Sequence, residues 1–148
     1  MRYWDASALV PLFVRQDRTS AMRALLRTDR LVVTWWCTST ECDSAVSRLE
    51  RDGLLAPTTA SAAFAKIARR AAQWDEVQPR PEIRTLARRL LRSHVLRAAD
   101  AMQLSAALTA CEHRPESLEF VCLDDRLRSA ADREGFPVLP AAGGSVSD

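Results

Sequence analysis

The sequence predicts an α/β fold in which a central, mostly parallel sheet of four to five strands is flanked by helices. Three observations support this prediction. Short apolar strand candidates alternate with amphipathic helices, the composition is that of a globular protein, and the length suits a single domain. The chain has 148 residues, of which 47% are hydrophobic and 27% are charged. A domain of this size can bury one core without disulfides or a structural metal.

Four short segments have the character of buried strands, because they are rich in apolar, β-branched or aromatic residues. They are Arg2–Trp4, Leu31–Trp36, Glu119–Leu123 and Pro137–Leu139. Trp35 and Trp36 are adjacent, so in a strand their side chains point to opposite faces. We expect one of them in the core and the other exposed, covered by a helix or kept for a partner.

The segments between the strands have helical periodicity. They are Ser7–Val14, Ser20–Arg27, Thr38–Asp52, Thr58–Trp74, Glu82–Ser93, Ala98–Cys111 and Asp125–Glu134. The helix over Glu82–Ser93 is the clearest, because its apolar stripe lies on a different face from a row of arginines. That row consists of Arg84, Arg88 and Arg92. We expect residues 1–140 to form the domain, and residues 141–148, which are small and centred on two glycines, to form a flexible tail.

Neither a membrane span nor a signal peptide is expected. The longest apolar run is Ala8–Val14, whereas a membrane span needs about 20 apolar residues. The four cysteines form no Cys-x-x-Cys pair, and their spacing fits no common zinc pattern. We therefore expect small buried thiols in a reducing cytosol, and a cytoplasmic protein.

Carboxylates occupy unusual places in this pattern. Asp5 and Asp124 each follow a strand directly, and ligands of α/β sheets bind beyond the carboxyl ends of the strands. Asp100 continues the apolar stripe of its helix towards the core, and Glu41 lies in the first turn of another helix. Each acid also has a simpler interpretation: Asp5 and Asp124 as helix N-caps, Asp100 and Glu41 as acids favoured by the helix dipole.

Taken together, the four acids suggest a single pocket. Several carboxylates in one pocket repel each other unless a cation balances them, and their hard oxygens suit Mg²⁺ or Mn²⁺. Such ions activate water and stabilise a phosphodiester transition state. Other chemistries fit less well. The histidines, His94 and His113, have no Gly-x-Ser-x-Gly partner, and the chain has no glycine-rich phosphate loop.

Four groups of residues, in this order, carry a resemblance to a known family. They are Tyr3–Val10; Thr38–Glu41 with Ser44–Leu49; His94–Leu108; and Phe120–Leu127 with Ala130, Ala131, Gly135 and Phe136. They resemble the acidic motifs of the PIN-domain nucleases, and His94–Leu108 resembles the third-acid helix of the VapC-like toxins of bacterial toxin–antitoxin pairs. The resemblance covers about residues 1–139, and implies a single PIN-like domain.

The resemblance implies a metal-dependent endoribonuclease, often a homodimer, that a cognate antitoxin protein holds inactive. Asp5, Glu41, Asp100 and Asp124 match the acidic quartet, and Ser7 matches the hydroxyl residue beside the first acid. On this basis Asp5, Asp100 and Asp124 would bind Mg²⁺ or Mn²⁺, and Glu41 would hold the ion or orient the attacking water.

Asp124 and Asp125 compete for the last acidic position. Asp124 lies three residues before Leu127, which matches the Asp-x-x-Leu spacing of the family. Asp125, the first residue of the following helix, could then support a second ion.

The charge distribution is compatible with an RNA substrate. The formal net charge is only +2, but residues 66–97 carry nine basic and three acidic groups, and residues 98–148 carry four and nine. Arg84, Arg88, Arg92 and Arg97 in the basic segment are candidate RNA-binding residues, although the first three could equally be a solvated helix face. We expect the RNA to be single-stranded or looped.

Two other classes of protein stay as alternatives. The first is a non-enzymatic RNA- or protein-binding module with the same fold, against which the retention of all four acids argues. The second is a phosphoacceptor receiver domain, which needs a lysine near its last strand. Lys66, the only lysine, lies in mid-chain and within a predicted helix.

Overall fold

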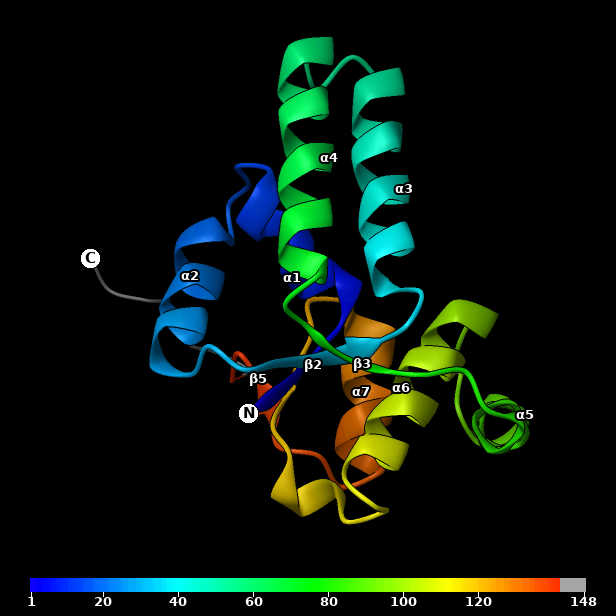
Figure 1. Ribbon diagram of the computed structural model, residues 1–148. Coiled ribbons are helices and arrows are strands. Elements are labelled where there is room, and N and C mark those ends of the chain that lie inside the picture. Colours follow the sequence, from blue (N-terminus) through cyan, green and yellow to red (C-terminus); the bar gives the residue numbers. More distant parts are fainter. Residues whose placement is uncertain (142–148) are drawn as a thin grey trace.

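A five-stranded sheet forms the centre of the molecule (Figure 1). The computed structural model describes residues 1–141. The strands are β1 (Arg2–Trp4), β2 (Val32–Trp35), β3 (Asp75–Val77), β4 (Phe120–Val121) and β5 (Val138–Leu139). Their spatial order is β3-β2-β1-β4-β5, and every neighbouring pair is parallel. The predicted α/β fold is therefore confirmed. The expected flexible tail, Ala141 excepted, lies outside the described residues.

Helices connect the strands and cover both faces of the sheet. They are α1 (Ala6–Phe13), α2 (Thr19–Thr28), α3 (Thr38–Arg51), α4 (Pro57–Ala71), α5 (Pro81–Ser93), α6 (Ala98–Ala110) and α7 (Asp125–Arg133), with a short 3-10 helix at Pro115–Ser117. Each predicted helix is present, and its ends lie within three residues of the prediction. The largest difference is at the end of α4, which stops at Ala71 because the chain enters β3 at Asp75.

The strand β3 was missing from the sequence prediction. Its sequence is Asp-Glu-Val, and its residues are exposed or only half-buried, so it lacks the apolar character by which buried strands are recognised. It pairs with β2 at the edge of the sheet, where Val33 lies opposite Asp75. An edge strand tolerates charged side chains, and these also discourage pairing with another chain.

The sheet separates two hydrophobic cores, because successive side chains of a strand point to opposite faces. Tyr3 belongs to the core that lies under α5, α6 and α7. Trp4, the next residue, belongs to the core under α1, α2, α3 and α4. Figure 1 shows α3 and α4 side by side, projecting from the sheet as a helical hairpin. Gly53 ends α3 with a φ of 72°, a left-handed conformation that glycine adopts without strain.

The tryptophan pair and the cysteines behave as predicted. Trp35 is 3% exposed and Trp36 is 50% exposed. All four cysteines are free thiols, and all but the half-buried Cys37 are buried. Within residues 1–141, no helix is long and apolar enough to cross a membrane.

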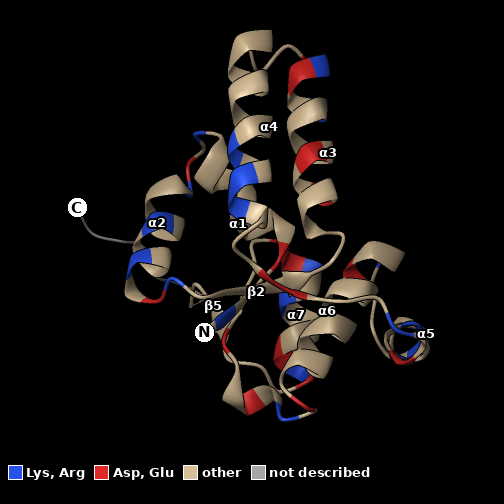
Figure 2. Cartoon of the chain, in the orientation of Figure 1, with Lys and Arg blue, Asp and Glu red and all other residues tan. Residues whose placement is uncertain are grey.

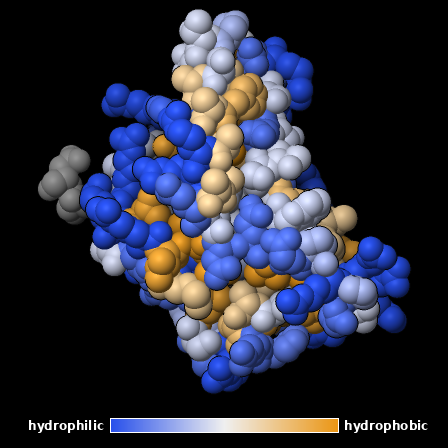
Figure 3. Space-filling model, in the orientation of Figure 1, coloured by the Kyte–Doolittle hydropathy of each residue, from blue (hydrophilic) through white to orange (hydrophobic). Residues whose placement is uncertain are grey.

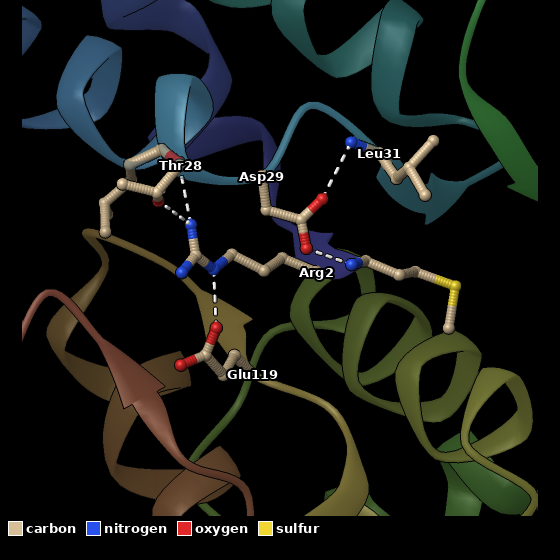
Figure 4. A network of polar contacts seen from close by, with 7 residues as sticks. Arg2, Thr28, Asp29, Leu31 and Glu119 are labelled. Atoms are coloured by element: carbon tan, nitrogen blue, oxygen red, sulfur yellow. Dashed lines mark hydrogen bonds and ion pairs between the residues drawn. The ribbon is translucent and has the colours of Figure 1, made fainter.

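At the amino edge of the sheet, charged side chains are paired with each other (Figure 4). The Arg2 guanidinium binds the Glu119 carboxylate, with 2.5 Å between Nε and Oε2. It also donates to the Leu25 carbonyl (2.7 Å) and to the Thr28 hydroxyl (2.6 Å). These contacts join β1, α2 and the residue before β4. Asp29, nearby, accepts from the Leu31 amide and pairs with the amino terminus.

Candidate active site at the carboxyl edge of the sheet

The structure brings the four predicted acids to the opposite edge, the carboxyl edge of the sheet. Asp5 follows β1, and Asp124 lies three residues beyond β4, the parallel neighbour of β1. Glu41 lies in the first turn of α3, and Asp100 in the first turn of α6. Their charges act on one another: Asp5 raises the pKa of Glu41, Asp100 raises the pKa values of Asp5 and Glu41, and Asp124 raises that of Asp100. The four carboxylates therefore form one electrostatic cluster.

Asp5 is the most deeply buried of the four, with 4% exposed. Burial is the main cause that raises the pKa of its carboxyl, while hydrogen bonds from Ser7 lower it. Oδ2 accepts from the Ser7 amide at 3.0 Å and from the Ser7 hydroxyl, and lies 3.5 Å from the Cys122 sulfur. The Ser7 hydroxyl also accepts from the Leu123 amide at 2.9 Å, and so ties the ends of β1 and β4 together.

Glu41 has a pKa raised to about 7. Burial is the largest cause, and the negative charges of Asp5 and Asp100 add to it. Its Oε1 accepts a hydrogen bond from the Gln103 amide at 3.2 Å, which lowers the pKa and so opposes the other effects. Glu41 therefore titrates near neutral pH in the metal-free protein.

The helix-cap interpretations of the acids are also correct. Asp5 and Asp124 are the N-caps of α1 and α7, and Asp124 Oδ1 accepts from the Leu127 amide at 2.9 Å. Asp100 Oδ2 accepts from the Arg97 amide at 3.2 Å, at the start of α6. Burial is the main cause that raises the pKa of Asp100.

The hydrogen bonds of the fold use only one oxygen of each of the four carboxylates, through a cap bond in Asp5, Asp100 and Asp124 and through Gln103 in Glu41. Within residues 1–141, hydrogen bonds engage one oxygen of each acid and leave the other without a protein partner; those left are Asp5 Oδ1, Glu41 Oε2, Asp100 Oδ1 and Asp124 Oδ2. Nor does any ion pair in this part of the chain involve these acids. The fold thus fixes four carboxylates and keeps four oxygens available.

This donor set fits a hard divalent cation, which prefers carboxylate oxygens and would relieve the repulsion among the acids. As the side chains stand, no three His, Cys, Asp or Glu residues in the described part of the chain are grouped closely enough to hold an ion. Binding would therefore require the side chains to rotate towards a common centre. Asp5, Asp100 and Asp124 are the residues that would hold the ion.

The supporting residues differ in how close they come to the acids. Ser7 contacts Asp5 directly. Asp125 is exposed in the first turn of α7 and lines a shallow depression of about 300 Å³ together with Arg126 and Val95. Arg126 and Arg97 lower the pKa of Asp100, so both guanidinium groups are near the cluster. Arg84, Arg88 and Arg92 are exposed along α5.

The sequence prediction missed two residues that contact the cluster. Gln103 is fully buried and donates to Glu41. Cys122 is fully buried beside Asp5, and burial keeps its thiol protonated by raising its pKa. Gln103 had a recognisable signal, because it is a polar residue three positions after Asp100 in an otherwise small and apolar helix. Cys122 had none, since a cysteine in an apolar strand is ordinarily a packing residue.

A second surface, which includes Leu9, Leu12 and Phe13 of α1, combines basic and apolar side chains. Two adjoining cavities of about 510 and 320 Å³ lie between α2 and the end of α4, and share Leu26, Val32 and Trp74. The basic residues that line them are Arg23, Arg27, Arg30, Lys66, Arg69 and Arg70. Figure 2 shows basic residues on α2 and on α4. Figure 3 shows apolar surface beside the basic residues of α2. We call this surface the basic groove.

The chain matches no family model and no curated protein. The resemblance to PIN-domain nucleases therefore stays a prediction, and the geometry of the carboxyl edge carries the functional argument.

Proposed function

We propose that the protein is a Mg²⁺- or Mn²⁺-dependent endoribonuclease, the toxin of a toxin–antitoxin pair. The observation that carries the proposal is the cluster of four carboxylates from four elements, each with one oxygen held by the fold and one left free. Burial, with added repulsion from neighbouring carboxylates, raises the pKa values of Asp5, Glu41 and Asp100, so the metal-free site is unfavourable. Perturbed carboxyls at the carboxyl edge of a parallel sheet are typical of a functional site.

In this proposal the acids and the nearby arginines have different roles. Asp5, Asp100 and Asp124 would hold the ion, which would activate water and offset the charge that develops on the phosphate. A bound cation would favour the ionised form of Glu41, whose carboxylate would hold the ion or orient the water that attacks phosphorus and accept its proton. In-line attack would form the new P–O bond as the P–O3′ bond breaks, which leaves a 5′-phosphate on one fragment and a 3′-hydroxyl, protonated from solvent, on the other. Arg97 and Arg126 lie near Asp100 and would attract the RNA backbone.

The substrate that fits best is single-stranded or looped RNA, because a duplex hides its bases and hinders the approach to the scissile phosphate. The exposed arginines of α5 (Arg84, Arg88 and Arg92) and Arg97 would supply phosphate contacts. Phosphate contacts lose strength with salt, so cleavage should weaken steeply as ionic strength rises.

The test is cleavage of single-stranded RNA with Mg²⁺ or Mn²⁺, with and without EDTA. The native chain should cleave only when the metal is present, and Asp5→Asn should be inactive while it keeps the N-cap, because asparagine caps helices as well as aspartate does. Asp17→Asn, a change at an exposed acid between α1 and α2, is the matched control and should cleave normally. Cleavage that persists both in EDTA and in the Asp5→Asn variant would rule out the metal mechanism. No cleavage of any RNA would favour the non-enzymatic binding module.

The basic groove supports a protein partner as part of the same proposal. Six cationic side chains around an apolar floor complement a segment that has acidic residues beside an apolar stripe. A cognate antitoxin with such a segment would bind there. Co-expression with the product of a short adjacent reading frame should yield a complex, and Arg23→Glu with Arg70→Glu should weaken it about tenfold or more. Retention of full affinity by this double variant would place the antitoxin elsewhere.

We also propose that the protein is a homodimer in the cytoplasm. Leu91, Val95 and Trp36 are large hydrophobic residues that the monomer leaves exposed. Light scattering should give twice the monomer mass at high concentration, and a monomer at every concentration would contradict the dimer.

A further inference from the structure

Gln103 links Glu41 to the core of the protein. Its side chain is fully buried in α6, and its Nε2 donates to Glu41 Oε1 at 3.2 Å and to the Thr38 hydroxyl at 3.0 Å. Its Oε1 accepts from the Tyr3 hydroxyl at 2.7 Å. Both amide protons and the amide oxygen are therefore used, and one of the three contacts reaches the acidic cluster.

The surroundings fix which way the amide points. The Thr34 hydroxyl lies 2.7 Å from the Trp4 carbonyl, which can only accept, and 2.7 Å from the Thr38 hydroxyl. Since the single Thr34 proton goes to that carbonyl, Thr38 gives its own proton to Thr34 and offers Gln103 only an acceptor.

Tyr3 fixes the other end of the amide. A phenol is protonated at neutral pH, and the Tyr3 hydroxyl donates to Gln103 Oε1 at 2.7 Å. A flipped amide would turn its oxygen towards the Glu41 carboxylate, which repels it. Gln103 therefore presents a donor to Glu41 whenever Glu41 is ionised.

We propose that Gln103 is a positioning residue of the candidate active site, which holds Glu41 Oε1 and thereby leaves Oε2 for the ion or the attacking water. The inference rests on the proposed function. The rival interpretation is that Gln103 only stabilises the core, as buried and fully bonded amides do.

The discriminating variant is Gln103→Met, which keeps the length of the side chain and removes the donor. Its matched control is Ser105→Ala, because Ser105 is equally buried in α6 but bonds the Ile83 carbonyl at 2.7 Å, away from the acids. The first readout is the Kd for Mn²⁺, measured by calorimetry without RNA, and the second is RNA cleavage at saturating Mn²⁺. We expect Gln103→Met to raise the Kd or to lower the cleavage rate by about 10–100-fold, and Ser105→Ala to leave both within about twofold.

Tyr3→Phe gives a milder test that does not touch Glu41. Loss of the phenol removes one of the two contacts that orient the amide and leaves the contact with Thr38, so this variant should change the same quantity in the same direction by a smaller factor. Added to Gln103→Met, it should change nothing further, because both act through one contact. Tyr3→Phe also decides the question if Gln103→Met does not fold.

The outcomes separate the two proposals. If the native chain binds Mn²⁺ and cleaves RNA while Gln103→Met behaves like Ser105→Ala, the positioning role is wrong and the proposed function stands. A Tyr3→Phe variant indistinguishable from the native chain also overturns it. A native chain that neither binds Mn²⁺ nor cleaves RNA overturns the proposed function, and the inference with it.

Discussion

The two edges of the sheet both gather charged side chains, but only one of them neutralises the charge. At the amino edge, Arg2 binds the Glu119 carboxylate and donates to two oxygens of α2 (Figure 4). At the carboxyl edge lie four carboxylates whose charges act on one another, and within residues 1–141 none of them forms an ion pair. The amino edge is thus arranged for stability, whereas the carboxyl edge keeps charge that the fold does not balance.

The difference between the two edges shows where the fold carries unbalanced charge. Burial and mutual repulsion raise the pKa values of Asp5, Glu41 and Asp100, so ionisation of these groups destabilises the metal-free protein. Natural sequences depart from local optimality mainly at functional sites. The contrast makes a sharp prediction: removal of a charge should have opposite effects on stability at the two edges.

The largest expected effect concerns Asp5→Asn. Cleavage of RNA should fall by about 100-fold or more, because the site loses a charge that it presents to the ion. In EDTA at pH 8 the free energy of unfolding should rise by about 1 kcal/mol, because a buried charge among other negative charges is removed. Denaturant unfolding and a cleavage assay measure the two quantities.

Glu119→Gln is the matched control at the amino edge. It should lower the free energy of unfolding by up to about 1 kcal/mol, since it removes a partly exposed ion pair, and should leave cleavage unchanged. If Asp5→Asn lowers stability as Glu119→Gln does, the charge of Asp5 stabilises the fold and the contrast between the edges is wrong.

Arg2→Met should have the next largest effect. Arg2 makes three polar contacts at the amino edge, with Glu119, Leu25 and Thr28, and its side chain is 14% exposed. Loss of these contacts should lower the free energy of unfolding by about 1–2 kcal/mol. Cleavage per folded molecule should not change, because Arg2 lies at the opposite end of β1 from the acids. A selective loss of cleavage without loss of stability would contradict this assignment.

A smaller effect is expected from pH. The folded-state pKa of Glu41, about 7, lies above its ordinary value of 4.5. The stability that protonated Glu41 contributes is therefore complete below pH 4.5 and is lost as pH rises through about 7. Burial shifts Asp5 and Asp100 in the same sense. In EDTA the Tm should fall by several degrees between about pH 5 and pH 8, and Mg²⁺ at pH 8 should recover most of it.

Glu41→Gln isolates the source of this pH dependence. The variant should lose most of the fall in Tm, since the neutral amide has no charge to bury. A native chain whose Tm is flat over this range, or a variant that keeps the full slope, would show that the cluster carries no unbalanced charge.

Sequence patterns could predict the fold and the four acids, because strands, helices and the residues that follow strands have local signals. Asp5 and Asp124 were placed at one edge on the condition that their strands are neighbours, and the pairing of β1 with β4 meets it. Gln103 depends on three segments far apart in the sequence, namely Tyr3, Thr38 and Glu41, whose meeting is set by packing. The free oxygen of each acid is likewise a property of side-chain geometry, which no spacing encodes.

The smallest expected effect distinguishes Asp124 from its neighbour Asp125. Both residues are exposed, but the charge of Asp124 raises the pKa of Asp100, whereas Asp125 lines a depression shared with Val95 and Arg126. Asp124→Asn keeps the N-cap of α7 and should lower cleavage by about tenfold or more. Asp125→Asn should change cleavage by less than about threefold at saturating Mg²⁺. Equal losses in the two variants would mean that both carboxylates serve the site, and that a second ion binds on the side of α7.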